Sequence, residues 1–100
     1  MNQPIVVRHL NWDPWNEDHI AKHAVTREEV EDVFRGSPIF MDSYKNRIVA
    51  IGPTREGRIL AVALDPEPEG EAVYYPVSAR PASRKERGYY QEAARDRRNG

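Results

Sequence analysis

The segment Val77–Tyr90 constrains the fold most, because it passes from a β-strand into a helix through a sharp turn. A β-rich run ends at Arg80 and Pro81, and Ser83 and Glu86 then form the S-x-x-E pattern of a helix capping box. The segment therefore predicts a C-terminal helix that closely follows the last strand of a sheet. It also places Arg80 at a strand end with several more cations close by, which suits an anionic phosphate ligand.

Two further helices are predicted in the first third of the chain. Asp13-Pro14 supplies an N-cap followed by proline at the first helical position, and this helix is expected to run to about His23. A second capping box, Thr26–Glu29, begins the next helix, which Gly36 ends. A β-rich segment, Ile5–Trp12, precedes both helices and predicts a first strand.

The middle of the chain predicts strands. They are expected at Ile39–Met41, Ile48–Gly52, Ile59–Leu64 and Ala72–Ala79. The acidic, breaker-rich segment Asp65–Glu71 predicts a loop, and Pro76 indicates an edge or bulged position in the last strand because proline cannot donate to a ladder. The order predicts one α+β domain over residues 1–100, with two helices, an antiparallel sheet of about four to five strands, and a C-terminal helix.

Charge is distributed unevenly along a chain whose net charge is −1. Residues 78–98 carry seven basic and three acidic side chains, a local charge of +4. Residues 13–32 carry seven acidic and two basic side chains, a local charge of −5. A surface polarised in this way can steer an anion toward one side of the molecule although the total charge is near zero.

Composition excludes several classes of protein. The chain has no cysteine, which excludes disulfides, thiolate zinc sites and cysteine nucleophiles. No apolar run approaches the roughly 20 residues that span a bilayer, and the N-terminus lacks the pattern of a secretory signal. We therefore expect a cytoplasmic protein.

Three motifs occur in a fixed order. Trp12-Asp13-Pro14 leads to Lys22-His23 before the second capped helix, and Ile51-Gly52-Pro53-Thr54 leads through a glycine turn into an apolar strand. Val77-Ser78-Ala79-Arg80 then runs into the capped basic helix and a tyrosine. In this order and spacing, over roughly Trp12 to Tyr90, the chain resembles the BrnT family, toxins of type II toxin–antitoxin pairs that are related to the RelE and ParE toxins.

The resemblance implies a RelE-like α+β fold and metal-independent cleavage of RNA, hence arrested translation, with no cofactor and no metal. It also implies inhibition by a BrnA-like antitoxin with a DNA-binding domain, and joint repression of the operon. Operator DNA would be contacted only through the antitoxin, no membrane would be involved, and a homodimer remains open.

Cleavage of RNA without metal requires a base for the 2′-hydroxyl, cations for the charged phosphorus centre and an acid for the leaving oxygen. Arg47 and Arg80 are strand-associated cations suited to phosphate oxygens, with Lys22 or His23 assisting. These four are the candidate catalytic residues. The candidate RNA-binding residues are Arg84, Lys85, Arg87 and Tyr89.

Other interpretations stay open. Arg80 could form an ion pair with a neighbouring helix or the acidic loop, and Lys22-His23 could simply complement a helix C-terminus. Many relatives carry an acidic residue beside the arginine of the middle strand, whereas this chain has Asn46, which favours a second hypothesis: a catalytically weak module that binds the antitoxin and acts as a co-repressor. A third hypothesis, a metal site at His19 and His23 at i, i+4, lacks an obvious third ligand.

Overall fold

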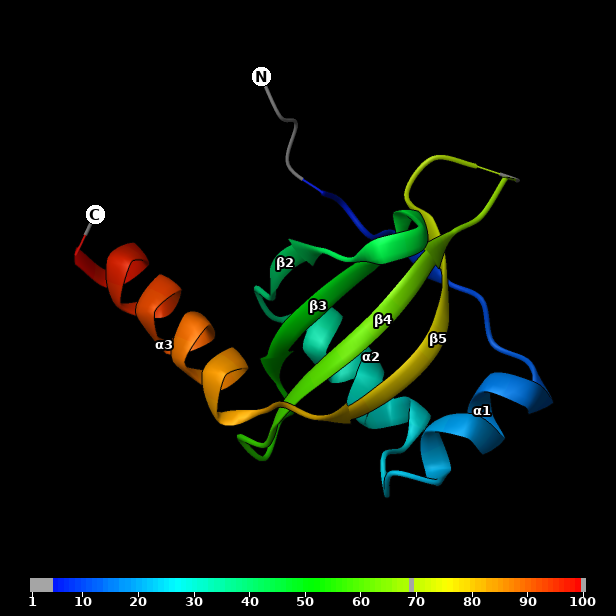
Figure 1. Ribbon diagram of the computed structural model, residues 1–100, viewed down its shortest axis with the longest axis horizontal. Coiled ribbons are helices and arrows are strands. Elements are labelled where there is room, and N and C mark those ends of the chain that lie inside the picture. Colours follow the sequence, from blue (N-terminus) through cyan, green and yellow to red (C-terminus); the bar gives the residue numbers. More distant parts are fainter. Residues whose placement is uncertain (1–4, 69, 100) are drawn as a thin grey trace.

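The computed structural model describes residues 5–68 and 70–99, which form a five-stranded sheet and three α-helices (Figure 1). In chain order the elements are β1 (His9–Leu10), α1 (Pro14–Ala21), α2 (Arg27–Arg35), β2 (Ile39–Asp42), a 3-10 turn (Tyr44–Asn46), β3 (Ile48–Pro53), β4 (Ile59–Pro66), β5 (Val73–Pro81) and α3 (Arg84–Asn99). The predicted α+β class and the order of helices and strands are confirmed.

The strands lie in the order β1-β5-β4-β3-β2. Neighbours from β2 to β5 are antiparallel, as predicted, whereas β1 pairs with β5 in parallel through only two residues. The first strand is therefore much shorter than the predicted span Ile5–Trp12. The ladder stops because, after the amide of Asn11 donates to the carbonyl of Tyr74, the chain turns away to cap α1.

All three predicted helix starts are confirmed. Asp13, Thr26 and Ser83 each accept a hydrogen bond from the backbone amide three residues later, and that residue's side chain bonds back to the cap amide. α1 ends at Ala21, two residues before the predicted end, and the following residues form a turn. The predicted bulge at Pro76 is confirmed by a register shift of β4 between Ala63 and Leu64, whose partner is Pro76.

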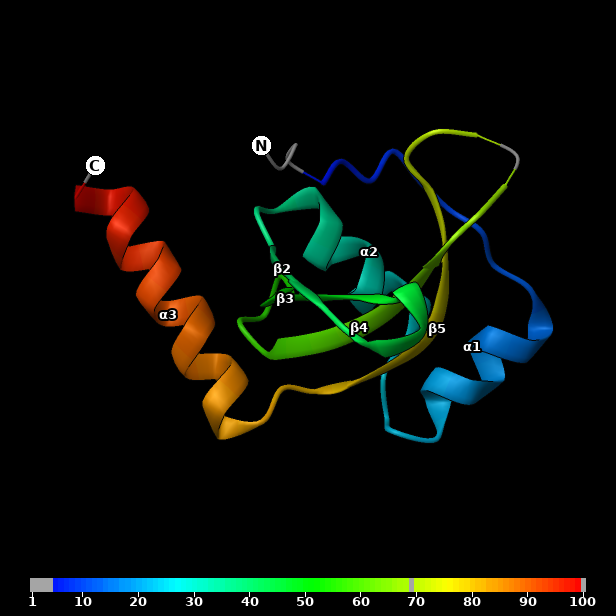
Figure 2. The ribbon, with the colours of Figure 1, turned by 45° about the horizontal axis from the view of Figure 1, so that its top comes forward.

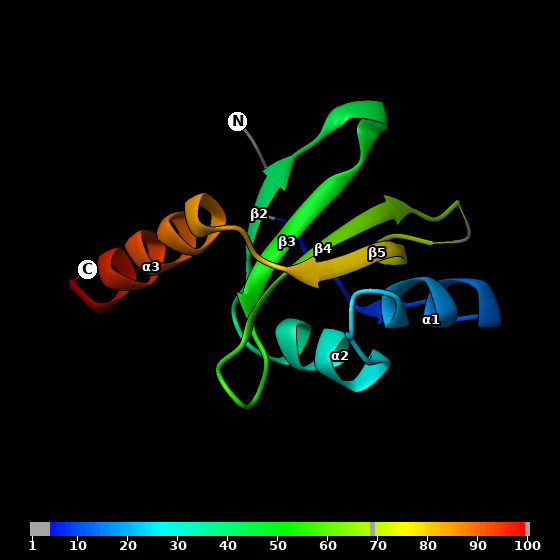
Figure 3. The same ribbon diagram turned by 60° about the horizontal axis from the view of Figure 1, so that its bottom comes forward.

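One face of the sheet, the inner face, is covered by α1 and α2. The buried cluster joins helix and strand residues of this layer: Leu10, Ile20, Val25, Val30, Val33, Ile48, Ala50, Leu60, Val62, Leu64 and Ala79. Figure 1 looks onto the opposite face, with α2 behind β3 and β4, and Figure 3 shows α2 below the sheet. Alternate strand residues point to opposite faces, so the neighbours of these buried residues form the outer face.

The outer face is only partly covered. A small cluster of Ile51, Ala61 and Ala82, with half-buried Tyr90 packed against it, seats the beginning of α3 beside β3. The rest of α3 extends past the edge of the sheet (Figure 2), where Arg97 donates to the carbonyl of Ser37. The β4–β5 side of the outer face is therefore left without a covering helix.

Candidate functional site

The uncovered part of the outer face collects the charged residues of the central strands. Arg80 on β5 is the register partner of Ala61 on β4, and Asp65 lies four residues further along β4 on the same face. Arg47 directly precedes β3 and reaches Asp65. Both candidate catalytic arginines thus belong to this face, as the alternation of the strands requires.

Arg80 is held by the first turn of α3. Its two terminal nitrogens donate to the two carboxylate oxygens of Glu86 at 2.6 and 2.9 Å. This bidentate hydrogen bond lowers the pKa of Glu86 from 4.5 to about 2 and raises that of Arg80. Because 47% of the Arg80 side chain remains exposed, the guanidinium can still be approached from solvent.

Arg47 is held in a similar way at the other end of the face. Its Nε donates to the carboxylate of Asp65 at 2.8 Å, and its side chain is about one-third exposed. A pocket of about 480 Å³ lies beside it, with Asn46 and Tyr74 among the lining residues. Asn46 adopts a left-handed backbone conformation, φ 62°, which asparagine tolerates better than most residues.

The two arginines do not converge. Four residues of β4 separate the level of Arg80 from the level of Arg47, which corresponds to about 13 Å along the strand. Each guanidinium is also bound to its own carboxylate. The geometry therefore fits two phosphate groups of one strand better than a single phosphate held by both residues.

Lys22 and His23 follow the last turn of α1, and both are exposed. α1 packs against β5, so this end of the helix lies on the β5 side of the sheet (Figure 1). In the described part of the chain, no hydrogen bond or ion pair joins either side chain to Arg47 or Arg80. The backbone amides of both residues bond to carbonyls of the last turn, which agrees with a structural role for this segment.

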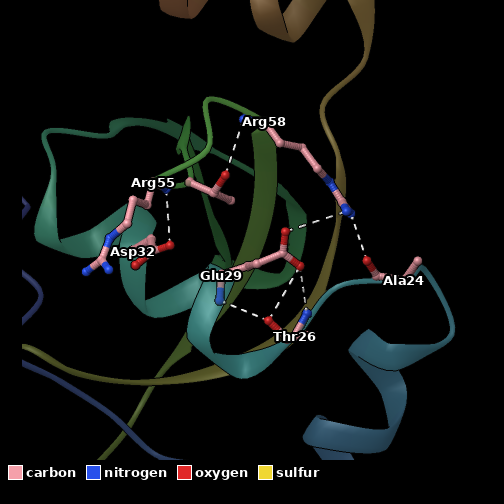
Figure 4. A network of polar contacts seen from close by, with 7 residues as sticks. Ala24, Thr26, Glu29, Asp32, Arg55 and Arg58 are labelled. Atoms are coloured by element: carbon pink, nitrogen blue, oxygen red, sulfur yellow. Dashed lines mark hydrogen bonds and ion pairs between the residues drawn. The ribbon is translucent and has the colours of Figure 1, made fainter.

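The turn after His23 is fixed by a polar network (Figure 4). Ala24 adopts a left-handed conformation, φ 57°, and its carbonyl accepts a hydrogen bond from Arg58 at 3.0 Å. Arg58 also lies 3.6 Å from Glu29, whose carboxylate accepts the amide hydrogen of Thr26. The β3–β4 hairpin thereby holds the connection between α1 and α2 in place.

The candidate RNA-binding residues lie together on the first turns of α3, directly after Arg80. Arg84 is exposed, Arg87 donates to the carbonyl of Ala82, and Lys85 lies 6.0 Å from the centre of the Tyr89 ring. Tyr89 faces solvent, with 39% of the residue exposed. A cationic, aromatic surface therefore continues the site from β5 onto α3.

The ion pair of Arg80 with a neighbouring helix, one of the interpretations left open by the sequence, is confirmed by Glu86 on α3. The sequence predicts only a capping role for Glu86 itself, and it places Asp65 in the loop. The alternation Ala61, Ala63, Asp65 was the available signal, since it carries β4 and its outer face beyond Leu64.

His19 and His23 do not gather further ligands. Their rings lie edge to face with centroids 6.4 Å apart, and His19 stacks on Trp15. Among residues 5–68 and 70–99, no group of three or more His, Cys, Asp or Glu side chains lies close enough together to hold a metal ion.

In the same part of the chain, none of the helices combines the length and apolarity needed to cross a membrane.

Comparison with known proteins identifies the family. No curated protein matches the chain. The family model described as the ribonuclease toxin BrnT of a type II toxin–antitoxin system matches residues 12–86, which include α1, α2, strands β2 to β5 and the Arg80–Glu86 pair. The chain therefore belongs to the BrnT family of ribonuclease toxins.

Proposed function

We propose that this chain is a metal-independent endoribonuclease that arrests translation and acts on RNA laid across the outer face of the sheet. The observation that carries the proposal is Arg80: it stands half-exposed on the uncovered face, oriented by Glu86, at the start of the cationic surface of α3. A fixed guanidinium at this place suits the phosphate of a bound strand.

The proposed reaction is an attack of the 2′-hydroxyl on the adjacent phosphorus. The 2′-hydroxyl gives its proton to a base as its oxygen bonds to phosphorus, and the bond to the 5′-oxygen breaks as that oxygen takes up a proton. The products are a 2′,3′-cyclic phosphate and a 5′-hydroxyl. Arg80 stabilises the charge that develops on the phosphate oxygens, and Arg47 holds a neighbouring phosphate. Lys22 or His23 assists, with His23 the residue type suited to proton transfer near neutral pH.

Membership of a type II toxin–antitoxin family also supports the proposal of an antitoxin partner. We propose that a BrnA-like antitoxin with a DNA-binding domain neutralises the chain and that the pair represses its own operon. The cationic face that binds RNA would have to be covered or made inaccessible for neutralisation. A gene for such a protein is expected next to the gene for this chain.

The second candidate function is a binding module with weak catalysis. It is favoured by the ion pairs of Arg47 and Arg80, because each carboxylate partner offsets the positive charge of its guanidinium. It is also favoured by Asn46, since an amide side chain cannot accept a proton at neutral pH. In that case the chain would bind its antitoxin and contribute to repression without cutting RNA.

Induced expression in bacteria, with wild type compared to Arg80→Ala, tests the proposal. We expect growth arrest and fragmented RNA with wild type, and a loss of about 100-fold or more in cleavage rate for the variant. Arg35→Ala is the matched control, since this arginine lies on α2 and pairs with Asp32, away from the outer face. Equal cleavage by wild type and Arg80→Ala would show that Arg80 is not in the site.

Purified protein separates the remaining hypotheses. Cleavage in EDTA that yields 5′-hydroxyl ends, and that a 2′-deoxy substitution at the cut position abolishes, agrees with the proposed reaction. Intact RNA with soluble, folded wild-type protein would favour the binding module.

A further inference from the structure

An exposed stack of rings lies beside β5, where α1 packs against this strand. Trp15 on α1 is 57% exposed, and its ring lies parallel to that of His19, with a centroid distance of 4.9 Å and an interplanar angle of 6°. Tyr75 on β5 lies 6.5 Å from Trp15 at 29°. The indole thus contacts two neighbouring rings, while 57% of the residue remains exposed to solvent.

The stack is fixed by contacts on both sides. The Tyr75 hydroxyl donates to the carboxylate of Asp13 at 3.0 Å, and partial burial together with this carboxylate raises the pKa of Tyr75 to about 12. Asp13 caps α1, so the same residue orients the helix that carries Trp15. A preorganised ring loses little conformational freedom when a ligand binds to it.

The stack is next to the candidate RNA site. Tyr75 is the register partner of Asp65, and Asp65 holds Arg47 at 2.8 Å. Directly opposed residues of antiparallel strands have neighbouring side chains on the same face. A strand whose phosphate meets Arg47 would therefore carry its base toward Tyr75 and Trp15.

The charges around Trp15 favour a flat, uncharged ligand group. Two of the nearby carboxylates are already engaged, since Asp13 binds Tyr75 and Glu17 pairs with Arg27 at 3.1 Å. Asp18 on α1 and Lys22 at the C-cap of this helix are both exposed and carry opposite charges. Asp13, Glu17 and Asp18 against Lys22 and Arg27 leave a net charge of only −1 here, a weak attraction for a basic peptide, whereas the exposed indole offers a ring face to any nucleobase.

We infer that Trp15, supported by His19 and Tyr75, is a stacking platform for one unpaired base of the RNA, beside the phosphate held by Arg47. The inference rests on the proposed function for its ligand. It adds a binding residue outside the cationic surface of α3 and confines the substrate to RNA that is single-stranded at this point, since a paired base has no free ring face.

The test uses an uncleavable oligonucleotide, oligo-uridine with 2′-fluoro sugars, and an abasic strand of the same length and charge. Trp12→Phe leaves Trp15 as the single tryptophan, because the chain has two. We expect the fluorescence of this variant to be quenched by the base-bearing strand and much less by the abasic one. Trp12 itself is half-buried and donates to Glu31, so this variant also serves as the matched control for loss of a tryptophan.

Trp15→Ala is expected to weaken binding of the base-bearing strand about tenfold and to leave the slope of affinity against salt concentration unchanged. Trp15→Phe should retain most of the affinity, because a ring face remains. The thermal unfolding of each variant shows whether it is folded. Wild-type affinity in a folded Trp15→Ala protein would overturn the inference, even if cleavage persisted.

Two other outcomes are distinguishable. If binding depends on Trp15 while cleavable RNA stays intact, the platform stands and the proposed ribonuclease function fails. If Trp15→Ala binds RNA normally but is no longer neutralised by its antitoxin, the stack is a protein-binding surface and the inference is wrong.

Discussion

Glu86 has two roles that depend on one carboxylate. It completes the capping box of α3 by accepting the amide hydrogen of Ser83 at 2.8 Å, and it binds both terminal nitrogens of Arg80. The helix start and the orientation of the candidate catalytic arginine are therefore coupled. A change at Glu86 should affect stability and the position of Arg80 together.

Glu86→Gln is expected to lower the free energy of unfolding by roughly 1–2 kcal/mol at pH 7, after allowance for the solvent screening of half-exposed Arg80. The folded-state pKa of Glu86, about 2, lies below its ordinary value of 4.5. Its stabilisation is therefore complete above pH 4.5 and is lost as the pH falls toward 2. Urea unfolding of both proteins at pH 7 and at pH 2.5 measures the difference.

Glu92→Gln, on the exposed side of α3, serves as the control and should change the unfolding free energy by less than about 0.5 kcal/mol at either pH. A difference between wild type and Glu86→Gln that stayed constant down to pH 2.5 would contradict the assigned ion pair.

The connection between α1 and α2 shows how one element accommodates a strained residue. Ala24 has φ 57°, a conformation that costs a residue with a Cβ about 1–2 kcal/mol relative to the right-handed region. The hydrogen bond from Arg58 to its carbonyl, and the pairing of Arg58 with Glu29, hold the turn. The tertiary contact thus stabilises a turn for which a glycine would be the ordinary choice.

Ala24→Gly is expected to raise the free energy of unfolding by about 0.5–1 kcal/mol, because the released strain exceeds the added entropy of the unfolded chain. Ala21→Gly, three residues earlier and still in α1, should instead destabilise by up to about 1 kcal/mol. Chemical denaturation of the two variants compares them directly. Destabilisation by both would mean that Ala24 is not strained in solution.

The molecule as a whole is electrically polarised. Four of the seven acidic side chains of residues 13–32 lie on α2, whereas the cations of residues 78–98 lie on the end of β5 and on α3. Figure 2 shows α1 and α3 at opposite sides of the sheet. An RNA strand would therefore be drawn first to α3 and the adjoining outer face, and held away from α2.

Replacing both Arg84 and Lys85 by alanine should weaken RNA binding and lower the slope of log affinity against log salt by about 1.4, or 0.7 for each lost phosphate contact. Fluorescence anisotropy at several salt concentrations measures the slope. The control variant Arg35→Ala, on the acidic side of the molecule, should leave this slope unchanged. An unchanged slope in the double variant would mean that the phosphate contacts are made by other residues.

The sequence by itself determined the features that depend on neighbouring residues. The N-cap of each helix, the turn at Gly57 and an edge or bulged position at Pro76 were predicted, because a cap or a turn is formed by residues within one or two helical turns of each other. For the same reason the order of elements and the α+β class followed from local patterns. The family followed from motifs whose order and spacing are written directly in the chain.

Only the tertiary structure decided which distant residues meet. The parallel pairing of β1, the ion pairs Arg47–Asp65 and Arg80–Glu86, and the stacking of Trp15 on Tyr75 all depend on it. Register is set by burial of one face of every strand at once, and α1 takes its place against β5 through that shared core. A single sequence shows which residues alternate, but the partner across the sheet is chosen by the packing of the whole domain.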